Sequence, residues 1–298
     1  MSQNKPVHVP VLLKEVVNYL ALLPGRSVVD GTLGLGGHAL SCLKEIGVKG
    51  KYYGFDLDEN NLKIAKKRLQ LFSSECQFFQ DSFVHCHDRL QELGITAVDA
   101  ILLDLGLSSP HVDDASRGFS FQKKAPLDMR FDRSKGLTAA HVLNNYTEYD
   151  LKTIFYRYGE EKYAPKLARM IVARRREKAL GITEDLMNLI QEIMRSPKDQ
   201  NRMASRVFQA LRIEVNDELN VLREAIPSLL SLLKSGGRMV VISYHSLEDR
   251  IVKQGFKQAA LNDCDYQILT KKPIVPSEAE LQKNPRSRSA KLRAIFKS

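Results

Sequence analysis

The sequence of 298 residues predicts an α/β fold, in which helices cover both faces of a parallel sheet and a helical domain is inserted into the chain. Two observations support this prediction. Short apolar runs alternate with segments of helical periodicity over roughly the first third of the chain, which is typical of a parallel sheet. The next comparable strand after Asp104 begins near Gly237, far beyond the about thirty residues that a single crossover needs.

Each strand is expected where a short apolar run ends in acidic or glycine residues, and each helix where apolar residues recur every three or four positions. The run VLLKEVVNYLALL has the helical spacing and stops at Pro24 and Gly25. The predicted strands cover residues 27–30, 51–58, 76–81, 98–106 and 236–246. The predicted helices before and between the first four cover residues 11–23, 38–46, 59–72 and 82–94.

The inserted segment is expected to be helical. Leu151, Ile154 and Phe155 follow the spacing of a helix, and a further helix is predicted over 183–194 with Thr183 as its N-cap. A helix over 216–233 then returns the chain to the sheet, bent or interrupted by its proline. The resulting division is a first core segment, the inserted domain and a second core segment, at residues 1–112, 113–206 and 207–298.

The composition is that of a cytoplasmic protein. Hydrophobic residues make up 43% of the chain, and no run approaches the about 18 apolar residues of a membrane helix. The start, MSQNKPVHVPVLLKEVV, lacks the apolar region of a signal peptide. Four cysteines show no C-x-x-C spacing, so we expect a reduced protein without structural disulfides. His85 and His87 flank Cys86, but neighbours at this spacing diverge on a helix, and we expect no metal site.

The charge is unevenly distributed. Lys and Arg number 45 against 35 Asp and Glu, a net charge of +10. Residues 115–205 contain 18 basic and 11 acidic residues, and the tail LQKNPRSRSAKLRAIFKS contains six basic residues and no acid. Two such zones favour a polyanionic partner over simple solvation. Arg286, Arg288 and Arg293 of the tail are expected to contact phosphate or, alternatively, to anchor the last strand.

The segment DGTLGLGGHAL, residues 30–40, joins the first predicted strand to the following helix. It matches the G-x-G-x-x-A pattern of dinucleotide sites, and Asp56 follows where such sites have a ribose acceptor. Asp30 precedes the glycines, however. Its carboxylate would repel a pyrophosphate at a helix N-terminus but attract the sulfonium and ammonium groups of S-adenosylmethionine. The pattern favours this cofactor, with a dinucleotide site or simple packing of the glycines as alternatives.

Asp104 ends the fourth predicted strand, where open α/β sheets bind their ligands. The following GLSSPH places a proline-containing turn after the acid, an arrangement common in enzymes that methylate amines. The amine on an aromatic base is a poor nucleophile because its lone pair is delocalised into the ring. Acceptors for its N–H groups direct the lone pair toward the methyl group. The alternative is a helix N-cap or a carboxylate that stabilises the loop.

Eight motifs in order resemble the bacterial ribosomal RNA small-subunit methyltransferase H family. They are DGTLGLGGH, ILLDLGLSSP, RGFSF, PLDMRFD, YGEE, RVFQALRIEVNDEL, ISYHSLEDR and NPRSRSAKLR. The resemblance implies transfer of a methyl group from S-adenosylmethionine to N4 of a cytidine in the decoding centre of 16S ribosomal RNA. It also implies a class I, Rossmann-like methyltransferase core with a seven-stranded sheet and a helical substrate domain.

The resemblance also implies the residues of the site. Asp104 is expected to act in catalysis, and His111 stands where the family usually has Gln; both side chains donate and accept hydrogen bonds. Phe83 is expected along the adenine or in the core, and His245 as a general base or a loop brace. The implied cofactor contacts are Gly36, Gly37, His38, Asp56, Phe83, Asp104 and His111.

The expected partner is 16S ribosomal RNA within the small ribosomal subunit, without a membrane or a metal, and with the protein as a monomer or homodimer. The target base must leave its stack to reach the methyl group. Aromatic and basic residues that alternate near the Asp104 loop are expected to hold the RNA; they are Arg117, Phe119, Phe121, Lys123 and Lys124. The alternatives are a dinucleotide-dependent oxidoreductase and a non-catalytic ribosome-assembly factor.

Overall fold

The computed structural model describes residues 10–72, 74–134 and 136–298. These residues form two compact units. The sheet unit consists of the chain up to Gly106 together with Leu219–Ser298, and the helical unit is Leu107–Glu218. The inserted domain was predicted over 113–206. The helical unit extends further because helix α10, Pro197–Asn216, continues without a break to its end.

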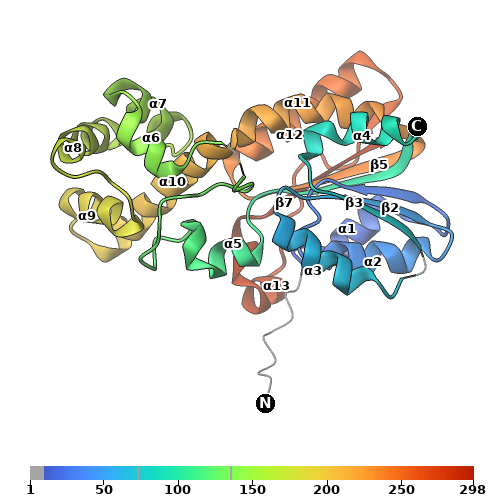
Figure 1. Ribbon diagram of the computed structural model, residues 1–298. Helices are drawn as coiled ribbons and strands as arrows, with labels where there is room; N and C mark the ends of the chain where they lie inside the picture. Colours follow the sequence, from blue (N-terminus) through green and yellow to red (C-terminus); the bar gives the residue numbers. More distant parts are fainter. Residues whose placement is uncertain (1–9, 73, 135) are drawn as a thin grey trace. The chain divides into compact units, whose positions relative to one another are not determined.

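The sheet unit contains a seven-stranded sheet with the strand order β3-β2-β1-β4-β5-β7-β6 (Figure 1). The seven strands and the α/β class are as predicted. The pairs from β3 to β5 are parallel, whereas β7 is antiparallel to both of its neighbours, so the sheet is mixed rather than wholly parallel. The strands are β1 Ser27–Asp30, β2 Lys51–Phe55, β3 Glu75–Phe79, β4 Val98–Asp104, β5 Leu233–Ser243, β6 Tyr266–Ile268 and β7 Lys291–Lys297.

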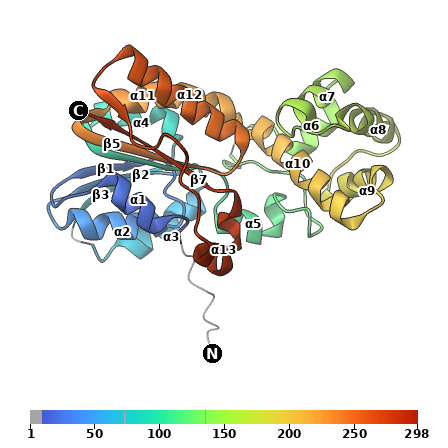
Figure 2. The ribbon, with the colours of Figure 1, turned by 180° about the vertical axis from the view of Figure 1, so that it is seen from behind.

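Helices cover both faces of this sheet (Figures 1 and 2). Successive side chains of a strand point to opposite faces, so Val28 packs with one group of helices and Val29 with the other. The first group is α1 Leu13–Leu20, α2 Gly37–Ile46 and α3 Glu59–Leu69. The second group is α4 Cys86–Glu92, α11 Glu218–Ser231 and α12 Ser246–Asn262. Helix α13, Glu278–Lys283, and two 3₁₀ turns, Phe83–His85 and Pro285–Ser289, complete the unit.

The helical unit has its own core, in which the buried residues of five helices pack together. A short helix and a 3₁₀ turn, α5 Ser109–Asp113 and Ala115–Arg117, precede them. The five are α6 Ala139–Asn145, α7 Glu148–Arg157, α8 Ala164–Glu177, α9 Thr183–Ile193 and α10. The periodicity at Leu151, Ile154 and Phe155 therefore marked a buried helix face, as predicted.

Two local predictions were wrong in detail. Thr183 is the first residue of α9, not its N-cap. Its hydroxyl donates to the carbonyl of Lys123 at 2.7 Å and accepts from the amide of Ala125 at 3.1 Å, so it fastens an upstream loop instead. Pro227 lies inside α11, so the predicted interruption is wrong, whereas a bend at this proline stays a prediction. The neighbouring Ala225 and Ile226 are buried.

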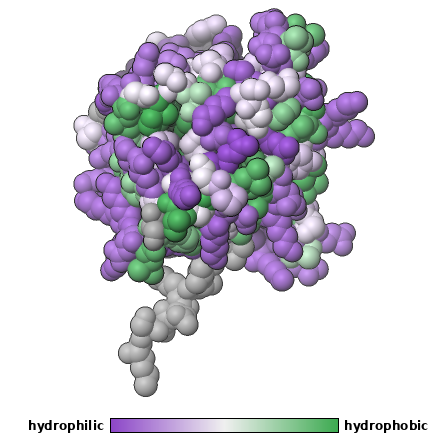
Figure 3. All heavy atoms as spheres, turned by 90° about the vertical axis from the view of Figure 1, so that its right-hand side faces the viewer, coloured by the Kyte–Doolittle hydropathy of each residue, from purple (hydrophilic) through white to green (hydrophobic). Residues whose placement is uncertain are grey.

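Within the described part of the chain, the search for a helix with the length and hydropathy needed to cross a membrane found none. The face in Figure 3 is mostly hydrophilic, with hydrophobic residues scattered over it. Large exposed apolar side chains occur singly in the sheet unit, for example Val48 and Leu71. Scattered apolar residues of this kind are normal on a folded protein.

The last strand is anchored by a buried ion pair. Arg293 on β7 is only 6% exposed, and its guanidinium donates to the carboxylate of Asp249 on α12 at 2.6 and 3.3 Å. The sequence allowed two roles for the basic tail, contact with phosphate and anchoring of the last strand. For Arg293 the structure shows the anchoring role. Arg286 and Arg288 are exposed in the 3₁₀ turn before the strand.

Asp99 ties together the amino-terminal ends of three central strands. Its carboxylate accepts from the amide of Ser27 at 2.8 Å, from the Ser27 hydroxyl at 2.6 Å and from Lys234 Nζ at 3.0 Å. Arg26 donates to its other oxygen. Burial alone would raise the pKa of Asp99, but the hydrogen bonds from Ser27, Arg26 and Lys234 hold it well below its ordinary value.

We therefore expect Asp99→Asn to lower the free energy of unfolding at neutral pH by about 2 kcal/mol, the scale of hydrogen bonds to a charged group. Because the folded pKa is lowered, this contribution is present above the unfolded pKa and is lost as the pH falls through the folded value. Urea denaturation at several pH values measures it. Glu224→Gln, at an exposed position on α11, is the control; an equal effect of both substitutions would contradict the assignment.

Candidate functional site

The carboxyl ends of β1, β2 and β4 lie side by side in the sheet. Asp30 pairs with Gly54 on one side and with Leu102 on the other. The glycine loop leaves the end of β1 and passes directly over β4, because Gly31 has no side chain: a Cβ there would lie 2.7 Å from Cβ of Phe83 and would overlap Leu103. This close approach brings the loop to the edge where ligands of open α/β sheets bind.

The loop then turns into α2 through Gly36, whose φ of 73° is in the left-handed region that favours glycine. Gly37 begins the helix, and a Cβ at this position would come within 2.7 Å of the Pro10 ring. These two predicted cofactor contacts therefore also have a structural reason to be glycine. The third member of the motif, His38, lies in the first turn of α2 and is 6% exposed.

Asp56 follows β2 and is held by the glycine loop. Its Oδ2 accepts from the amide of Gly34 at 2.8 Å, and its Oδ1 accepts from the amide of Asp58 at 2.8 Å. The amide group of Asn61 lies 3.3 Å from both oxygens. Asp56 thus links the glycine loop to the end of β2, and its contact with a ribose stays a prediction.

Asp30 has a structural role at the start of the glycine loop. The side chain is buried, with 2% exposed, and accepts from the Tyr52 hydroxyl at 2.7 Å and from the amide of Thr32 at 3.1 Å. Burial raises its pKa to about 6, against the lowering effect of these two hydrogen bonds. The carboxyl therefore supports the glycine loop through the amide of Thr32, and an attraction between Asp30 and a cationic cofactor stays a prediction.

Asp104 stands at the end of β4 with both carboxylate oxygens near polar groups. Tyr244, just beyond β5, donates its hydroxyl to Oδ1 at 2.8 Å. The imidazole Nε2 of His38 lies 3.5 Å from Oδ2, and neither ring nitrogen of His38 makes a hydrogen bond within the described residues. The backbone amide of Asp104 donates to Thr32 Oγ1 at 2.6 Å. About a quarter of the Asp104 side chain, 23%, is exposed.

Burial, together with the neighbouring Asp104 carboxylate, raises the pKa of Tyr244 far above its ordinary value. The hydroxyl therefore remains protonated at neutral pH and remains a donor to Asp104. A hydrogen bond from a buried phenol to a carboxylate is charge-assisted and directional. It fixes the orientation of the carboxyl group at the end of the strand.

Phe83 begins the 3₁₀ turn after β3, and its side chain is partly exposed. Its Cβ lies against Gly31, so the Phe83 side chain leaves the backbone next to the glycine loop. Ser82 precedes it and caps the turn by accepting from the amide of Val84. The structure therefore brings Phe83 to the same edge as Asp56 and Asp104, where a stacking role is sterically reasonable and stays a prediction.

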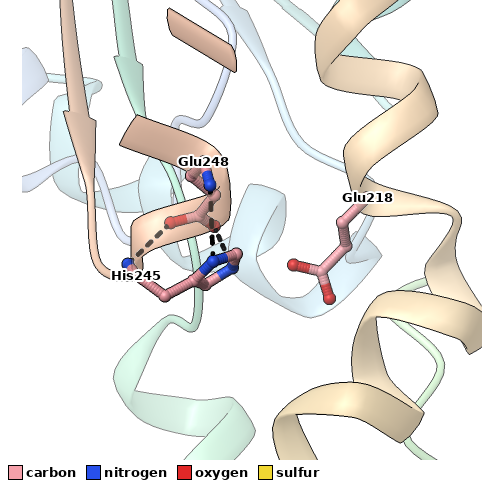
Figure 4. Close-up of side chains that lie close together, drawn as sticks. All are labelled: Glu218, His245 and Glu248. Carbon is pink, nitrogen blue, oxygen red and sulfur yellow. Dashed lines mark hydrogen bonds and ion pairs between the residues drawn. The ribbon is translucent and has the colours of Figure 1, made fainter. Parts of the chain in front are cut away.

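His245 caps α12 (Figure 4). Its Nδ1 accepts from the amide of Glu248 at 3.4 Å, and its Nε2 lies 3.1 Å from Glu248 Oε1. Glu248 in turn accepts from the amides of Tyr244 and His245 at 2.7 and 3.2 Å. This reciprocal arrangement satisfies helix N–H groups. Of the two interpretations for His245, the loop brace is the one that the geometry displays, and it holds the backbone beside Tyr244.

His111 lies in the helical unit and is 4% exposed. Its ring lies 5.2 Å from the ring centres of both Phe119 and Phe131, and its Nδ1 accepts from the amide of Ser108 at 3.3 Å. The other six predicted cofactor residues belong to the sheet unit. A contact between His111 and the cofactor stays a prediction.

The segment predicted to hold RNA is mostly occupied within its own unit. Arg117 is 5% exposed and donates to the carbonyls of Arg130 and Phe131 at 2.8 and 3.0 Å. Phe119 belongs to the core, and Phe121 packs edge-on against Phe208. Arg117, Phe119 and Phe121 thus take part in the folding of this unit. Lys123 and Lys124 are exposed, and the ammonium of Lys124 lies 3.1 Å from Glu184 Oε2.

A family model described as the MraW methylase family matches residues 5–298. The chain belongs to this family. The ribosomal RNA small subunit methyltransferase H of Dictyoglomus thermophilum is 46% identical over 294 residues, 98% of this chain and 97% of that protein. The protein of the same name from Dictyoglomus turgidum is 44% identical over 98% of each chain. A solved SAM-dependent O-methyltransferase from Thermotoga maritima has a TM-score of 0.45 and 9% identity, over 99% of this chain and 68% of that one.

Membership of this methylase family confirms the resemblance seen in the motifs, and it favours a methyltransferase over both an oxidoreductase and a non-catalytic assembly factor. Tyr244 and Tyr52 are two members of the site that the sequence did not indicate. Both follow from strand register: Asp104 pairs with Ile242, two residues before Tyr244, and Asp30 pairs with Gly54, two residues after Tyr52. Alternation along the strands could have indicated them, but only after the strand order was known.

The raised pKa of Asp30 predicts how stability depends on pH. A carboxyl whose folded pKa is about 6 contributes fully below the unfolded value near 4 and loses that contribution as the pH rises through 6. Asp30→Asn keeps one acceptor oxygen and cannot ionise. Between pH 4.5 and 7.5 the variant should therefore gain stability relative to the parent, by up to about 3 kcal/mol for two pKa units. Urea denaturation over this range tests it; a constant difference between the two proteins would refute it.

Proposed function

We propose that this methylase transfers a methyl group from S-adenosylmethionine to small-subunit ribosomal RNA, at N4 of a cytidine in the decoding centre of 16S RNA. Family membership and the names of the relatives at 44–46% identity support the reaction and the RNA class. The observation that supports an amine as the methyl acceptor is the Asp104 carboxylate, which Tyr244 orients at the carboxyl end of the central strand. The reaction requires no covalent nucleophile.

The residues at this edge suit S-adenosylmethionine. Asp56 is a fixed acceptor for ribose hydroxyls, and the glycine loop offers backbone groups beside it. His38 is buried, and neither of its ring nitrogens makes a hydrogen bond within the described residues. Its Nε2 lies 3.5 Å from Oδ2 of Asp104, at the same edge of the sheet. Buried polar groups in folded proteins nearly always have a partner. A bound polar molecule at this edge would supply one for His38.

S-adenosylmethionine supplies, when bound, a methyl group activated by a positively charged sulfur. In the transfer the amine nitrogen gains positive charge as its bond to the methyl carbon forms and the carbon–sulfur bond breaks, with that electron pair going to sulfur. The nitrogen then releases one proton to solvent. A carboxylate near that nitrogen stabilises the transition state more than the neutral ground state, which is the condition for catalysis. Asp104 can also accept an N–H hydrogen bond, and this directs the nitrogen lone pair. Tyr244 acts on the reaction by holding this carboxylate in one orientation.

Asp56→Ala should weaken the binding of S-adenosylmethionine about tenfold or more, because charge-assisted hydrogen bonds of roughly 1.5–3 kcal/mol are lost. Isothermal titration calorimetry on the purified variant measures the dissociation constant. Asp88→Ala, at an exposed carboxylate of the same unit, is the matched control. Unchanged affinity in a folded Asp56→Ala protein would remove this residue from the site.

Asp104→Asn keeps the shape of the side chain but removes its charge. We expect the single-turnover rate, with cofactor and RNA both saturating, to fall by a factor on the order of 10², the scale of one electrostatic contact in a transition state. Tyr244→Phe keeps the charge and loses only the orienting hydrogen bond, so a smaller loss of about tenfold is expected. A normal rate combined with much weaker cofactor binding would reduce Asp104 to a cofactor ligand.

The position of the methyl group is tested on the product. Small-subunit ribosomal RNA incubated with the protein and labelled cofactor is digested to nucleosides and analysed by mass spectrometry. N4-methylated cytidine at one position in the decoding centre is the expected product. Methylation of a ribose hydroxyl or a ring carbon would overturn the assignment of the amine as acceptor.

A further inference from the structure

Three tyrosines of the helical unit expose their rings. Tyr149 and Tyr156 on α7 are 70% and 68% exposed, and Tyr163, just before α8, is 36% exposed. Positions seven apart lie two turns apart on one face of a helix. Lys152 lies on that face between the two α7 rings, with its ammonium 5.4 Å from the centre of the Tyr149 ring. The opposite face of α7 supplies core residues.

Helix α8 carries a basic stripe on its exposed side. Lys166, Arg169 and Arg176 are all exposed, and their spacing of three and seven places them on one face. The other face buries Leu167 and Ile171 in the core of the unit. With a rise of 1.5 Å per residue, the stripe runs for about 15 Å along the helix. This length corresponds to a few nucleotides of a single strand.

The basic stripe lies beside α7, because α7 and α8 pack against each other in a helical hairpin. The Nε of Arg169 lies 4.0 Å from Oε1 of Glu148, which places the middle of the stripe beside the start of α7. Lys166 and Arg176 have no carboxylate within ion-pair distance among the described residues. The stripe is therefore only weakly neutralised by the protein itself.

We infer that this α7–α8 surface binds a single-stranded segment of RNA, with the rings of Tyr149 and Tyr156 stacking on bases and the basic side chains contacting phosphates. The surface consists of Tyr149, Lys152, Tyr156, Lys166, Arg169 and Arg176. The inference rests on the proposed function, since it assigns to the RNA substrate a second contact region, on the helical unit. Such a region would hold the RNA while one base is extruded.

The chemistry favours RNA over a protein partner. Exposed aromatic rings interleaved with cations are the means by which proteins bind unpaired bases and their backbone, and each stacked base contributes roughly 1–3 kcal/mol. The central part of a protein interface is instead depleted in charged residues, lysine above all. Here Lys152 lies on the same face of α7 as the two tyrosines, with its ammonium 5.4 Å from the centre of the Tyr149 ring. The positive charges and exposed aromatic rings thus match single-stranded RNA, which carries both phosphates and unpaired bases.

Binding of a fluorescein-labelled, unstructured oligoribonucleotide to the full chain, measured by anisotropy, tests the inference. The double substitution Tyr149→Ala with Tyr156→Ala should weaken binding at least tenfold, whereas Tyr149→Phe with Tyr156→Phe should bind like the parent because stacking is retained. Equal weakening by the Phe and Ala pairs would overturn stacking as the mode of contact. Parental affinity in the Ala pair would overturn the site, including the case in which the surface serves an acidic protein partner.

Salt dependence tests the basic stripe separately. Replacing Lys166, Arg169 and Arg176 together with Gln should lower the slope of log affinity against log salt by about 2, at roughly 0.7 for each phosphate contact of a single strand. The matched control replaces three exposed basic residues of the sheet unit, Arg223, Lys253 and Lys257, with Gln. Equal effects of the two triple substitutions would show general charge attraction and overturn the assignment to α8.

A last comparison separates this inference from the proposed function. The α7–α8 variants should keep the parental affinity for S-adenosylmethionine, and their methylation rate should recover at saturating RNA, so that KM rises while kcat holds. Loss of kcat with unchanged KM would contradict a role in RNA binding. If the parent binds the oligoribonucleotide through this surface but methylates no ribosomal RNA, the proposed function fails while the binding surface stands.

Discussion

Strands β1, β4 and β5 pair in parallel, and their register decides where every predicted catalytic group of the sheet unit lies. Asp30 pairs with Leu102, and Asp104 pairs with Ile242. The loop after β1 can cross the end of β4 only because Gly31 has no side chain to meet Leu103. This contact brings the glycine loop to the end of β4, and the pairing of β4 with β5 places the Tyr244 hydroxyl beside the Asp104 carboxylate.

The same residue type has opposite properties at the two ends of these strands. Asp99, at the amino-terminal side, is surrounded by donors from Ser27, Arg26 and Lys234, which lower its pKa. Asp30, at the carboxyl end, is enclosed more completely and has fewer donors, so its pKa is raised. The balance of desolvation against hydrogen bonds explains both directions. One acid therefore stabilises the sheet as an anion, while the other supports the glycine loop as a group that resists ionisation.

The basic residues of the helical unit divide in a similar way. Arg117 and Arg175 give their donors to backbone carbonyls, and Arg206 forms an ion pair with the buried Glu161. These three stabilise the unit itself. The residues of the α8 stripe face solvent on the same unit. A basic composition therefore shows that a polyanionic partner is plausible, but burial decides which cations are available to it.

Local pattern in the sequence determined the order of the elements, the inserted helical unit, the glycine loop and the strand-end positions of Asp56 and Asp104, because hydrophobic period and turn residues act over short distances. Only the tertiary structure decided the reversed β7, the burial of Asp30, Arg117 and Arg293, and the hydrogen bond from Tyr244 to Asp104. Each of these features depends on which strand or helix packs next to the residue concerned. Residues far apart in the chain supply the desolvation and the donors, and neither can be read from a single segment.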